Sequence, residues 1–213
     1  MKIENAVSED SREVRDQANP GRPQGEEGKK MLKRMNVSHA PLRKFAFSCV
    51  PWRDHMHILD IGCGGGAAIR ELLDIAPNSV VEGIDYSQES VRQTEKYNAA
   101  EIGKRVFVRL GDVEILPYES GSFDVVTAIE TVYFWEDVPM AIRGIRRILK
   151  EGGRLMIICE GSDPDNMPDW PKIDGTFRIY RPEELETFMR QAGLSHVEIF
   201  HGEGQYICVT GTR

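Results

Sequence analysis

The sequence contains few cysteines, and their positions suggest neither a covalent framework nor a metal-bound one. The 213 residues include four cysteines, spread along the chain without paired spacing. This excludes a disulfide scaffold or a zinc knuckle as the basis of the fold. The two histidines His55 and His57 immediately precede a predicted strand and do not match the spacing of a metal-binding motif, so the sequence predicts no metal site.

Long apolar runs are also absent, and so is an excess of positive charge. No stretch approaches the length that crosses a bilayer, and residues 1–20 lack the apolar core of a signal peptide. We therefore expect a cytoplasmic protein without membrane insertion. Acidic side chains outnumber basic ones by 34 to 27, for a net charge of −7. Because nucleic-acid affinity comes largely from Lys and Arg that neutralise phosphates, this charge argues against a nucleic-acid partner.

The chain divides into a polar N-terminal segment and one patterned domain. Residues 1–30 are nearly free of large apolar side chains, so they cannot bury enough surface to offset their ordering entropy, and we expect a mobile arm. Residues 31–213 have a length that suits one domain. At its start, residues 31–52 show helical spacing interrupted near Pro41. The Pro- and Asp-rich segment 161–176 is too long for a simple connection.

From residue 57 onward, short apolar runs alternate with amphipathic stretches. The runs predict strands, and the stretches, with apolar residues three and four positions apart, predict helices. The last two runs flank a glycine-rich turn and predict an antiparallel hairpin. The sum is an α/β fold, a mostly parallel sheet with helices on both faces. The predicted strands cover residues 57–61, 80–84, 106–110, 123–129, 154–159, 197–200 and 206–210.

A glycine-rich segment, Asp60-Ile61-Gly62-Cys63-Gly64-Gly65-Gly66, follows the first predicted strand. Glycines at the carboxyl end of a strand let the backbone turn tightly and approach a ligand, with the next helix N-terminus pointing at it. Gly62, Gly64 and Ala67 also fit the loose dinucleotide pattern, and Asp85 lies where a ribose-binding acid would. The glycines alone therefore leave an NAD(P)-dependent oxidoreductase open.

Three further features favour a different ligand. Asp60, two positions before the first glycine, would repel a pyrophosphate but can accept from the ammonium group of a methionine moiety. Gly111-Asp112-Val113 supplies an acid and an apolar side chain where an adenine would lie. The sequence after the fifth predicted strand is too short for the separate catalytic domain of a dehydrogenase.

Taken together, these segments resemble the motifs of class I S-adenosylmethionine-dependent methyltransferases. The glycine-rich segment is similar to their first motif, and 82–87, 111–113, 122–126 and 149–155 resemble the later ones in order. Residues 180–194 extend the likeness toward small-molecule methyltransferases of the ubiquinone/menaquinone-biosynthesis type. The resemblance implies a Rossmann-like, seven-stranded sheet of order 3-2-1-4-5-7-6 with strand 7 antiparallel. It also implies methyl transfer from S-adenosyl-L-methionine to a small-molecule acceptor, with S-adenosyl-L-homocysteine as product.

Matching positions to the family motifs implies which residues contact the methyl donor. The glycine-rich segment would line its methionine part, the acid after the second strand its ribose, and the third motif its adenine. Glu130 would touch either the donor or the acceptor. The implied donor-binding residues are Asp60, Gly62, Cys63, Gly64, Asp85, Tyr86, Gly111, Asp112, Val113 and Glu130.

The acceptor is expected beyond the fourth strand, where a carboxylate, a phenol and two aromatic rings follow one another. Glu130, Tyr133 and, from the N-terminal helices, His39 are the candidate catalytic residues, since only an acceptor that loses a proton needs a base. Residues 31–52 and 161–176 are candidate lids over this site. A homodimer is compatible with the sequence. A catalytically silent S-adenosylmethionine-binding protein also stays open, because fold does not fix function.

Overall fold

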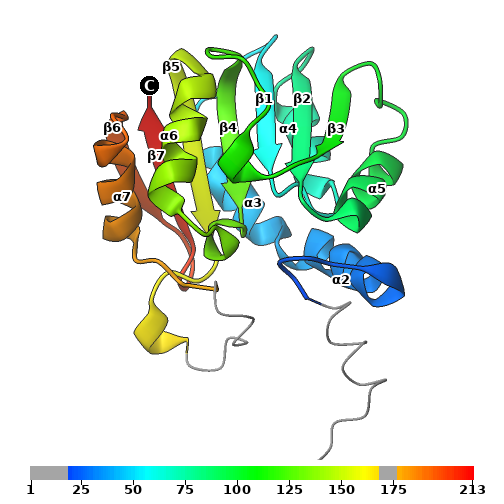
Figure 1. Ribbon diagram of the computed structural model, residues 1–213, viewed down its shortest axis with the longest axis horizontal. Helices are drawn as coiled ribbons and strands as arrows, with labels where there is room; N and C mark the ends of the chain where they lie inside the picture. The colour runs from blue at the N-terminus through cyan, green and yellow to red at the C-terminus, as the bar shows by residue number, and fades with distance from the viewer. Residues whose placement is uncertain (1–18, 168–176) are drawn as a thin grey trace, which may run out of the picture.

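A single seven-stranded sheet organises the computed structural model, which describes residues 19–167 and 177–213. The strand order is β3-β2-β1-β4-β5-β7-β6 (Figure 1). Neighbouring strands from β3 to β5 run parallel, and β7 is antiparallel to both β5 and β6. The α/β class, the strand order and the antiparallel last strand are therefore confirmed. The strands are β1 His57–Ile61, β2 Val80–Asp85, β3 Val106–Leu110, β4 Phe123–Ile129, β5 Leu149–Cys159, β6 Ser195–His201 and β7 Ile207–Thr212.

Helices cover both faces of the sheet, because successive residues of a central strand point to opposite faces. In β5, Leu155 and Ile157 pack in the core beneath α6 and α7, whereas Met156 and Ile158 pack in the core beneath α3 and α4. A strand that is apolar on both faces reads as a continuous apolar run. The helices are α2 Gly25–Ser38, α3 Ala40–Ser48, α4 Ala67–Ile75, α5 Gln88–Tyr97, α6 Val138–Ile148 and α7 Pro182–Gln191.

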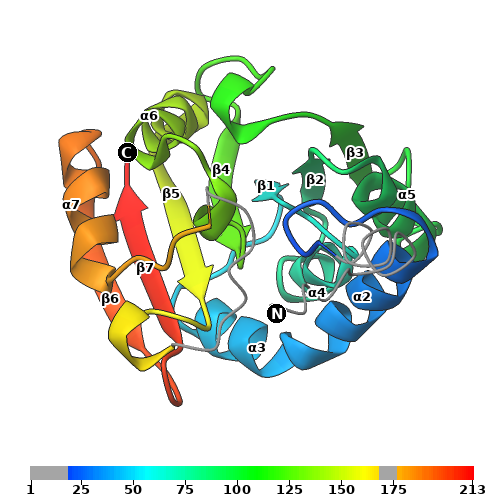
Figure 2. The same cartoon turned by 60° about the horizontal axis from the view of Figure 1, so that its bottom comes forward.

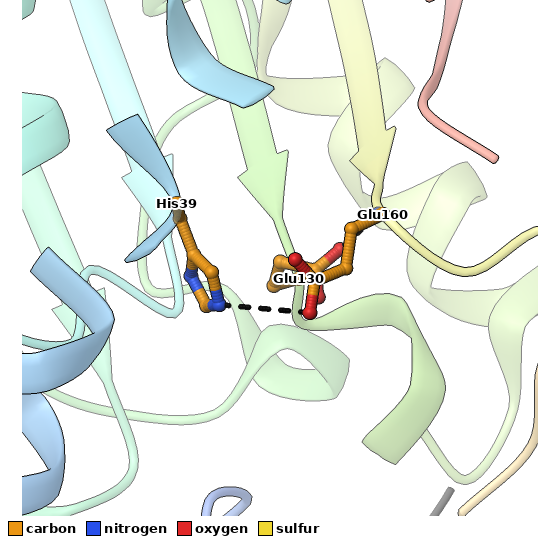
Figure 3. A group of neighbouring side chains, drawn as sticks. All are labelled: His39, Glu130 and Glu160. Carbon is orange, nitrogen blue, oxygen red and sulfur yellow. Dashed lines mark hydrogen bonds and ion pairs between the residues drawn. The ribbon is translucent and has the colours of Figure 1, made fainter. Parts of the chain in front are cut away.

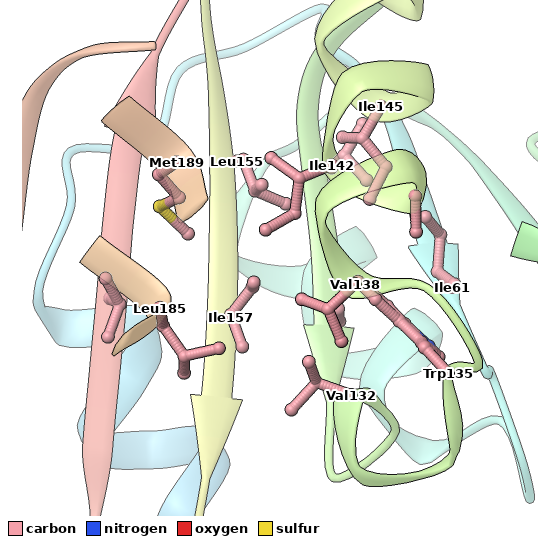
Figure 4. Close-up of a cluster of buried hydrophobic side chains, with 14 of the residues drawn as sticks. Ile61, Val132, Trp135, Val138, Ile142, Ile145, Leu155, Ile157, Leu185 and Met189 are labelled. Carbon is pink, nitrogen blue, oxygen red and sulfur yellow. The ribbon is translucent and has the colours of Figure 1, made fainter. Parts of the chain in front are cut away.

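The core under α6 is the larger one. Figure 4 shows Ile142 of α6 facing Leu155 and Ile157 of β5, and Met189 of α7 packs in the same core. Asp137 is the N-cap of this helix, and its side chain accepts from the backbone N–H of Met140 at 2.8 Å. Such a cap satisfies a donor that the first helical turn leaves free.

Two boundaries differ from the sequence prediction. Helix α2 begins at Gly25 rather than after residue 30, and the Ser87 hydroxyl donates to the Pro23 carbonyl at 2.6 Å, so the arm packs on the domain before residue 30. Strand β5 begins at Leu149, which pairs with Phe123 ahead of a bulge. These pairings depend on residues far along the chain, so local spacing did not reveal them. Residues 1–18 of the predicted arm lie outside the described residues.

The carboxyl ends of the parallel strands meet at one edge of the sheet. Figure 1 and Figure 2 show α2 and α3 lying along this edge, beside the tips of β1 and β4. The break between the two helices falls at His39, near the predicted Pro41. In open α/β sheets ligands bind outside these strand ends. Among the helices of the described residues, none is long and apolar enough to cross a membrane.

The core under α6 gives a first test. Ile142 is fully buried, whereas Met140, two residues earlier on the same helix, is 40% exposed. Replacing Ile142 with Ala should lower the free energy of unfolding by about 2–5 kcal/mol, because the lost methyl groups leave a cavity. Met140→Ala is the matched control and should change it by less than about 0.5 kcal/mol. Urea denaturation followed by circular dichroism measures both, and equal losses would contradict this packing.

Candidate functional site

The glycine-rich loop after β1 takes a conformation that favours glycine. Gly62, Gly64 and Gly66 have φ values of +70°, +53° and +82°, in the left-handed region. A Cβ atom on Gly62 would lie 2.5 Å from the Thr131 hydroxyl oxygen. The tips of β1 and β4 therefore approach one another closely only because residue 62 has no side chain.

Polar side chains from neighbouring helices hold this loop in place. Asn36 of α2 donates to the Gly65 carbonyl at 2.9 Å, and Thr94 of α5 donates to the Gly64 carbonyl at 2.9 Å. Helix α2 thus lies directly against the glycine loop, in the position expected of the N-terminal helices. No sequence motif singled out Thr94, since only the packing of α5 brings it to the loop.

The loop and the tips of β2, β3 and β4 line a pocket. Four of its lining side chains are carboxylates, Asp85, Asp112, Glu114 and Glu136, and its lining in the described structure contains no lysine or arginine. Carboxylates so close together create a negative potential in the pocket. The sequence predicted Asp85 and Asp112 here but not the two glutamates. The complete lining is Ile61, Gly62, Ile84, Asp85, Tyr86, Gly111, Asp112, Val113, Glu114, Thr131, Phe134, Trp135 and Glu136.

Asp85, at the end of β2, is the buried carboxylate of the pocket. Its two oxygens accept from the backbone N–H groups of Ser87 at 2.8 Å and Gly64 at 3.0 Å. Burial raises the pKa of this carboxyl to about 6, although both hydrogen bonds act to lower it. Asp85 therefore joins the glycine loop to the second strand and also faces the pocket.

Three of the predicted donor-binding residues of the glycine motif, Asp60, Cys63 and Gly64, lie outside the pocket lining. The Asp60 side chain is 2% exposed and accepts from the Thr127 hydroxyl at 2.7 Å. Burial raises the pKa of Asp60 to about 7, with that hydrogen bond opposing the shift. The Cys63 thiol is buried against the backbone of Gly83. Only the main chain of Cys63 can therefore face a ligand, and Asp60 supports the loop from within the core.

Aromatic rings border the pocket on its outer side. Tyr86 is 44% exposed, with the Arg22 guanidinium 5.7 Å from its ring centre. Phe134 packs against Gly21, where a Cβ atom would lie only 2.6 Å from the ring. Trp135 belongs mainly to the core and shows the pocket a small part of its surface. The segment before α2 thus reaches the edge of the pocket.

A second polar group, the His39–Glu130–Glu160 cluster, lies beside the pocket at the tips of β4 and β5 (Figure 3). The Glu130 carboxylate accepts from the Tyr133 hydroxyl at 2.9 Å and from the Glu160 backbone N–H at 2.5 Å. Glu130 also has φ +57°, unusual for a residue with a side chain. Its neighbour Thr131 lines the pocket, so the cluster and the pocket share one loop.

The electrostatics of this cluster follow from its burial. Burial and then the Glu160 carboxyl raise the pKa of Glu130 to about 8. Burial and then the Arg43 guanidinium lower the pKa of His39 to about 4, so its imidazole is neutral at pH 7. Tyr133 is 1% exposed, and its hydroxyl also accepts from the Gly161 N–H at 3.1 Å. It therefore orients Glu130 and cannot face an acceptor, in contrast to its predicted catalytic place.

The structure brings together residues that the sequence left apart, and sequence reasoning missed Glu160. Glu160 directly follows β5, and Glu130 directly follows the neighbouring parallel strand β4, so both lie at the same edge of the sheet. The position of Glu160 after an apolar run was the only sign of this in the sequence. The structure describes the predicted lid 161–176 only up to Met167. Within this part, the Asp163 carboxylate accepts from the Arg181 guanidinium at 2.7 Å. Its remaining residues 168–176, including Trp170 and Ile173, lie outside the described part of the chain.

The strand order, the glycine loop at β1 and the acids at the next two strand tips define a class I, Rossmann-like methyltransferase fold. Comparison with known proteins agrees: residues 59–157 match the family model described as a methyltransferase domain. The chain is 32% identical over 154 residues to 27-O-demethylrifamycin SV methyltransferase of Amycolatopsis mediterranei, covering 68% of this chain and 56% of that protein. It is 32% identical over 158 residues to demethylmenaquinone methyltransferase of Lactiplantibacillus plantarum, covering 72% and 63%.

A solved structure shows the same architecture. A SAM-dependent methyltransferase from Aquifex aeolicus superposes with a TM-score of 0.72 at 18% identity, covering 85% of this chain and 96% of that one. The chain spans 56% and 63% of the length of the two curated relatives. Residues 59–157 are thus similar to methyltransferase domains, and the fold that contains them is the class I, Rossmann-like one.

The close approach at Gly62 gives a second test. Gly62 and Gly121 have φ values of +70° and +71°, but a Cβ atom at Gly121 meets nothing within 4 Å. Both alanine variants should lose about 1–2 kcal/mol from the left-handed backbone. Gly62→Ala should lose about 1–3 kcal/mol more, because its methyl group collides with Thr131. Urea denaturation of the two variants measures the difference, and equal losses would show that the strand tips can separate freely.

The buried carboxyl of Asp60 gives a third test, by pH. Its pKa rises from 3.8 to about 7 on folding, so the folded chain holds this proton more tightly than the unfolded chain. The stability it contributes is present below its unfolded pKa and is lost as pH rises through 7. Asp60→Asn cannot titrate, so the unfolding free energy of wild type relative to this variant should fall from about pH 4 to about pH 7 and level off above that. A pH-independent difference in urea unfolding would contradict the shift.

Proposed function

We propose that this protein transfers a methyl group from S-adenosyl-L-methionine to a small-molecule acceptor. The observation that carries the proposal is the acidic pocket at the strand tips, lined by four carboxylates and, among its described residues, by no lysine or arginine. The methyl donor carries positive charge on its sulfonium and ammonium groups, which a negative pocket attracts. A dinucleotide would bring a pyrophosphate, which the same carboxylates would repel.

The glycine loop supports this choice of ligand. Its N–H groups are used within the protein: Gly62 donates to the Ile84 carbonyl at 2.8 Å, and Gly64 donates to Asp85. Loops that cradle phosphates instead turn successive N–H groups toward the ligand. The absence of side chains at Gly62 and Gly111 still allows a ligand to approach the backbone closely.

The residues of the pocket divide among the parts of the donor. The backbone of Gly62, Cys63 and Gly64 would line the methionine part, Asp85 would accept from the ribose hydroxyls, and Tyr86 would pack against the adenosine. The third motif would surround the adenine, through the Asp112 carboxylate and the backbone of Gly111 and Val113. Asp60 contributes indirectly, by fixing the loop through Thr127.

The acceptor belongs on the side of the pocket that α2, α3 and the His39–Glu130–Glu160 cluster border. Because the sulfonium donor supplies an already activated methyl group, the protein mainly aligns the acceptor with it and excludes water. Glu130 and His39 are the residues placed to contact an acceptor, and the lids would be residues 31–52 and 161–176. Relatives that act on rifamycin and menaquinone precursors favour an organic small molecule.

The location, the partners and the catalytic competence expected from the sequence are also part of this proposal. We propose a cytoplasmic protein that acts on no nucleic acid, in keeping with its net charge of −7, and for which a homodimer is one possible assembly. The intact glycine loop and strand-tip acids support turnover over a silent donor-binding protein, since a silent chain is free to lose them.

The donor site can be tested without knowing the acceptor. Asp85→Asn should weaken binding of S-adenosyl-L-methionine and S-adenosyl-L-homocysteine by about 10–100-fold, because a hydrogen bond to a charged group contributes about 1.5–3 kcal/mol. Asp74→Asn, at an exposed carboxylate paired with Arg70, is the control and should bind like wild type. Isothermal titration calorimetry measures all three proteins. Binding of NADH, with no binding of either sulfur compound, would overturn the proposed function.

A further inference from the structure

The His39–Glu130–Glu160 cluster has the composition of a metal site. Each residue comes from a different element: His39 joins α2 to α3, Glu130 follows β4, and Glu160 follows β5. One ligand atom of each, an imidazole nitrogen and two carboxylate oxygens, lies within 4.8 Å of the others. Figure 3 shows the imidazole turned toward the two carboxylates.

No lysine or arginine pairs with the two carboxyl groups of this cluster in the described part of the chain. Among the described ion pairs, Glu160 pairs only with His39, at 3.9 Å, and Glu130 pairs with no basic side chain. Arg43, the nearest guanidinium to the histidine, is held by Glu71 at 2.8 Å and by the Asn36 carbonyl at 2.8 Å. Buried carboxylates are normally paired or bound to a metal. A cation between these side chains would supply the missing partner.

The spacing fits an ion better than a direct hydrogen bond. The His39 Nε2 and Glu160 Oε1 atoms are 3.9 Å apart, too far for an N–H to donate effectively. Ligand atoms bound to one tetrahedral ion at about 2.1 Å lie about 3.4 Å from one another. Movements of up to about 0.7 Å at each ligand atom would bring atoms that lie as much as 4.8 Å apart to this separation.

The surroundings also supply the supporting hydrogen bonds that metal ligands need. Within the described chain, the Tyr133 hydroxyl and the Glu160 N–H both bond to Oε1 of Glu130, which leaves Oε2 for a ligand. Such second contacts hold a carboxylate in one orientation. They also explain why Tyr133 is buried next to the cluster without reaching solvent.

We propose that His39, Glu130 and Glu160 bind a divalent transition-metal ion. One imidazole nitrogen and two carboxylate oxygens suit Zn²⁺, Co²⁺ or Mn²⁺, whereas Mg²⁺ prefers oxygen ligands alone. With three protein ligands the ion keeps an open position. This site differs from the sequence expectation of no metal, because its ligands are far apart in the chain and have no motif spacing.

The site borders the acceptor side of the pocket. Glu130 precedes Thr131, which contacts Gly62 and lines the pocket. If the proposed function holds, an oxygen or carboxylate of the acceptor would take the open position of the ion. The metal site itself does not depend on methyl transfer, since it rests on the three side chains alone.

Metal binding can be measured on the full chain after dialysis against a chelator. Wild type should bind one equivalent of Zn²⁺ in isothermal titration calorimetry, and Co²⁺ should give visible d–d absorption. His39→Ala and Glu160→Gln should each weaken Zn²⁺ binding at least about tenfold, the lower end of what even outer partners of metal ligands contribute. His201→Ala, at an exposed histidine of β6, and Glu203→Gln, at an exposed turn, should bind like wild type.

Circular dichroism and S-adenosyl-L-homocysteine titration of each variant separate metal loss from misfolding. The proposal is overturned if folded wild type binds no stoichiometric Zn²⁺ or Co²⁺. It is equally overturned if Zn²⁺ binding survives in both His39→Ala and Glu160→Gln, which would place the ion at other surface groups. Zn²⁺ binding without S-adenosyl-L-homocysteine binding would instead refute the proposed function and leave the metal site standing.

Discussion

The contact between the turn at Gly62 and the tip of β4 is the constraint on which the site depends. A Cβ atom at residue 62 would overlap Thr131, so these two strand ends can lie together only with glycine there. The same turn orients the Gly64 N–H so that it donates to the Asp85 carboxylate, and this hydrogen bond joins the end of β1 to the end of β2. One backbone feature thus sets the relative positions of the tips of β1, β2 and β4, and the residues after β3 complete the pocket.

Two polar sites of different character follow from this arrangement. The pocket collects carboxylates from the segments that follow β2, β3 and β4. The His39–Glu130–Glu160 cluster collects its side chains from β4, β5 and the N-terminal helices, where burial perturbs them more strongly. Thr131 connects the two, because it lines the pocket and directly follows Glu130. A donor and an acceptor bound at these sites would therefore meet across a single loop.

Much of the fold could be read from the sequence because its signals are local. Short apolar runs marked the strands, because a central strand that is buried on both faces is apolar along most of its length. The glycine motif and the acids at the following strand ends placed the pocket correctly. Boundaries were less accurate where long-range pairing decided them, as at Leu149, which begins β5 by pairing with Phe123.

By itself, the sequence determined the α/β class and the acids at the strand tips, because strand periodicity and turn glycines act over a few residues. The order of the strands followed from the resemblance of its motifs to those of class I methyltransferases. Only the tertiary structure decided which side chains face the pocket. It turned Asp60 and Tyr133 into the core and brought Glu160 beside Glu130 and His39. These outcomes depend on packing between elements distant in the chain, and the burial of each carboxyl, which sets its pKa, exists only once those elements have come together.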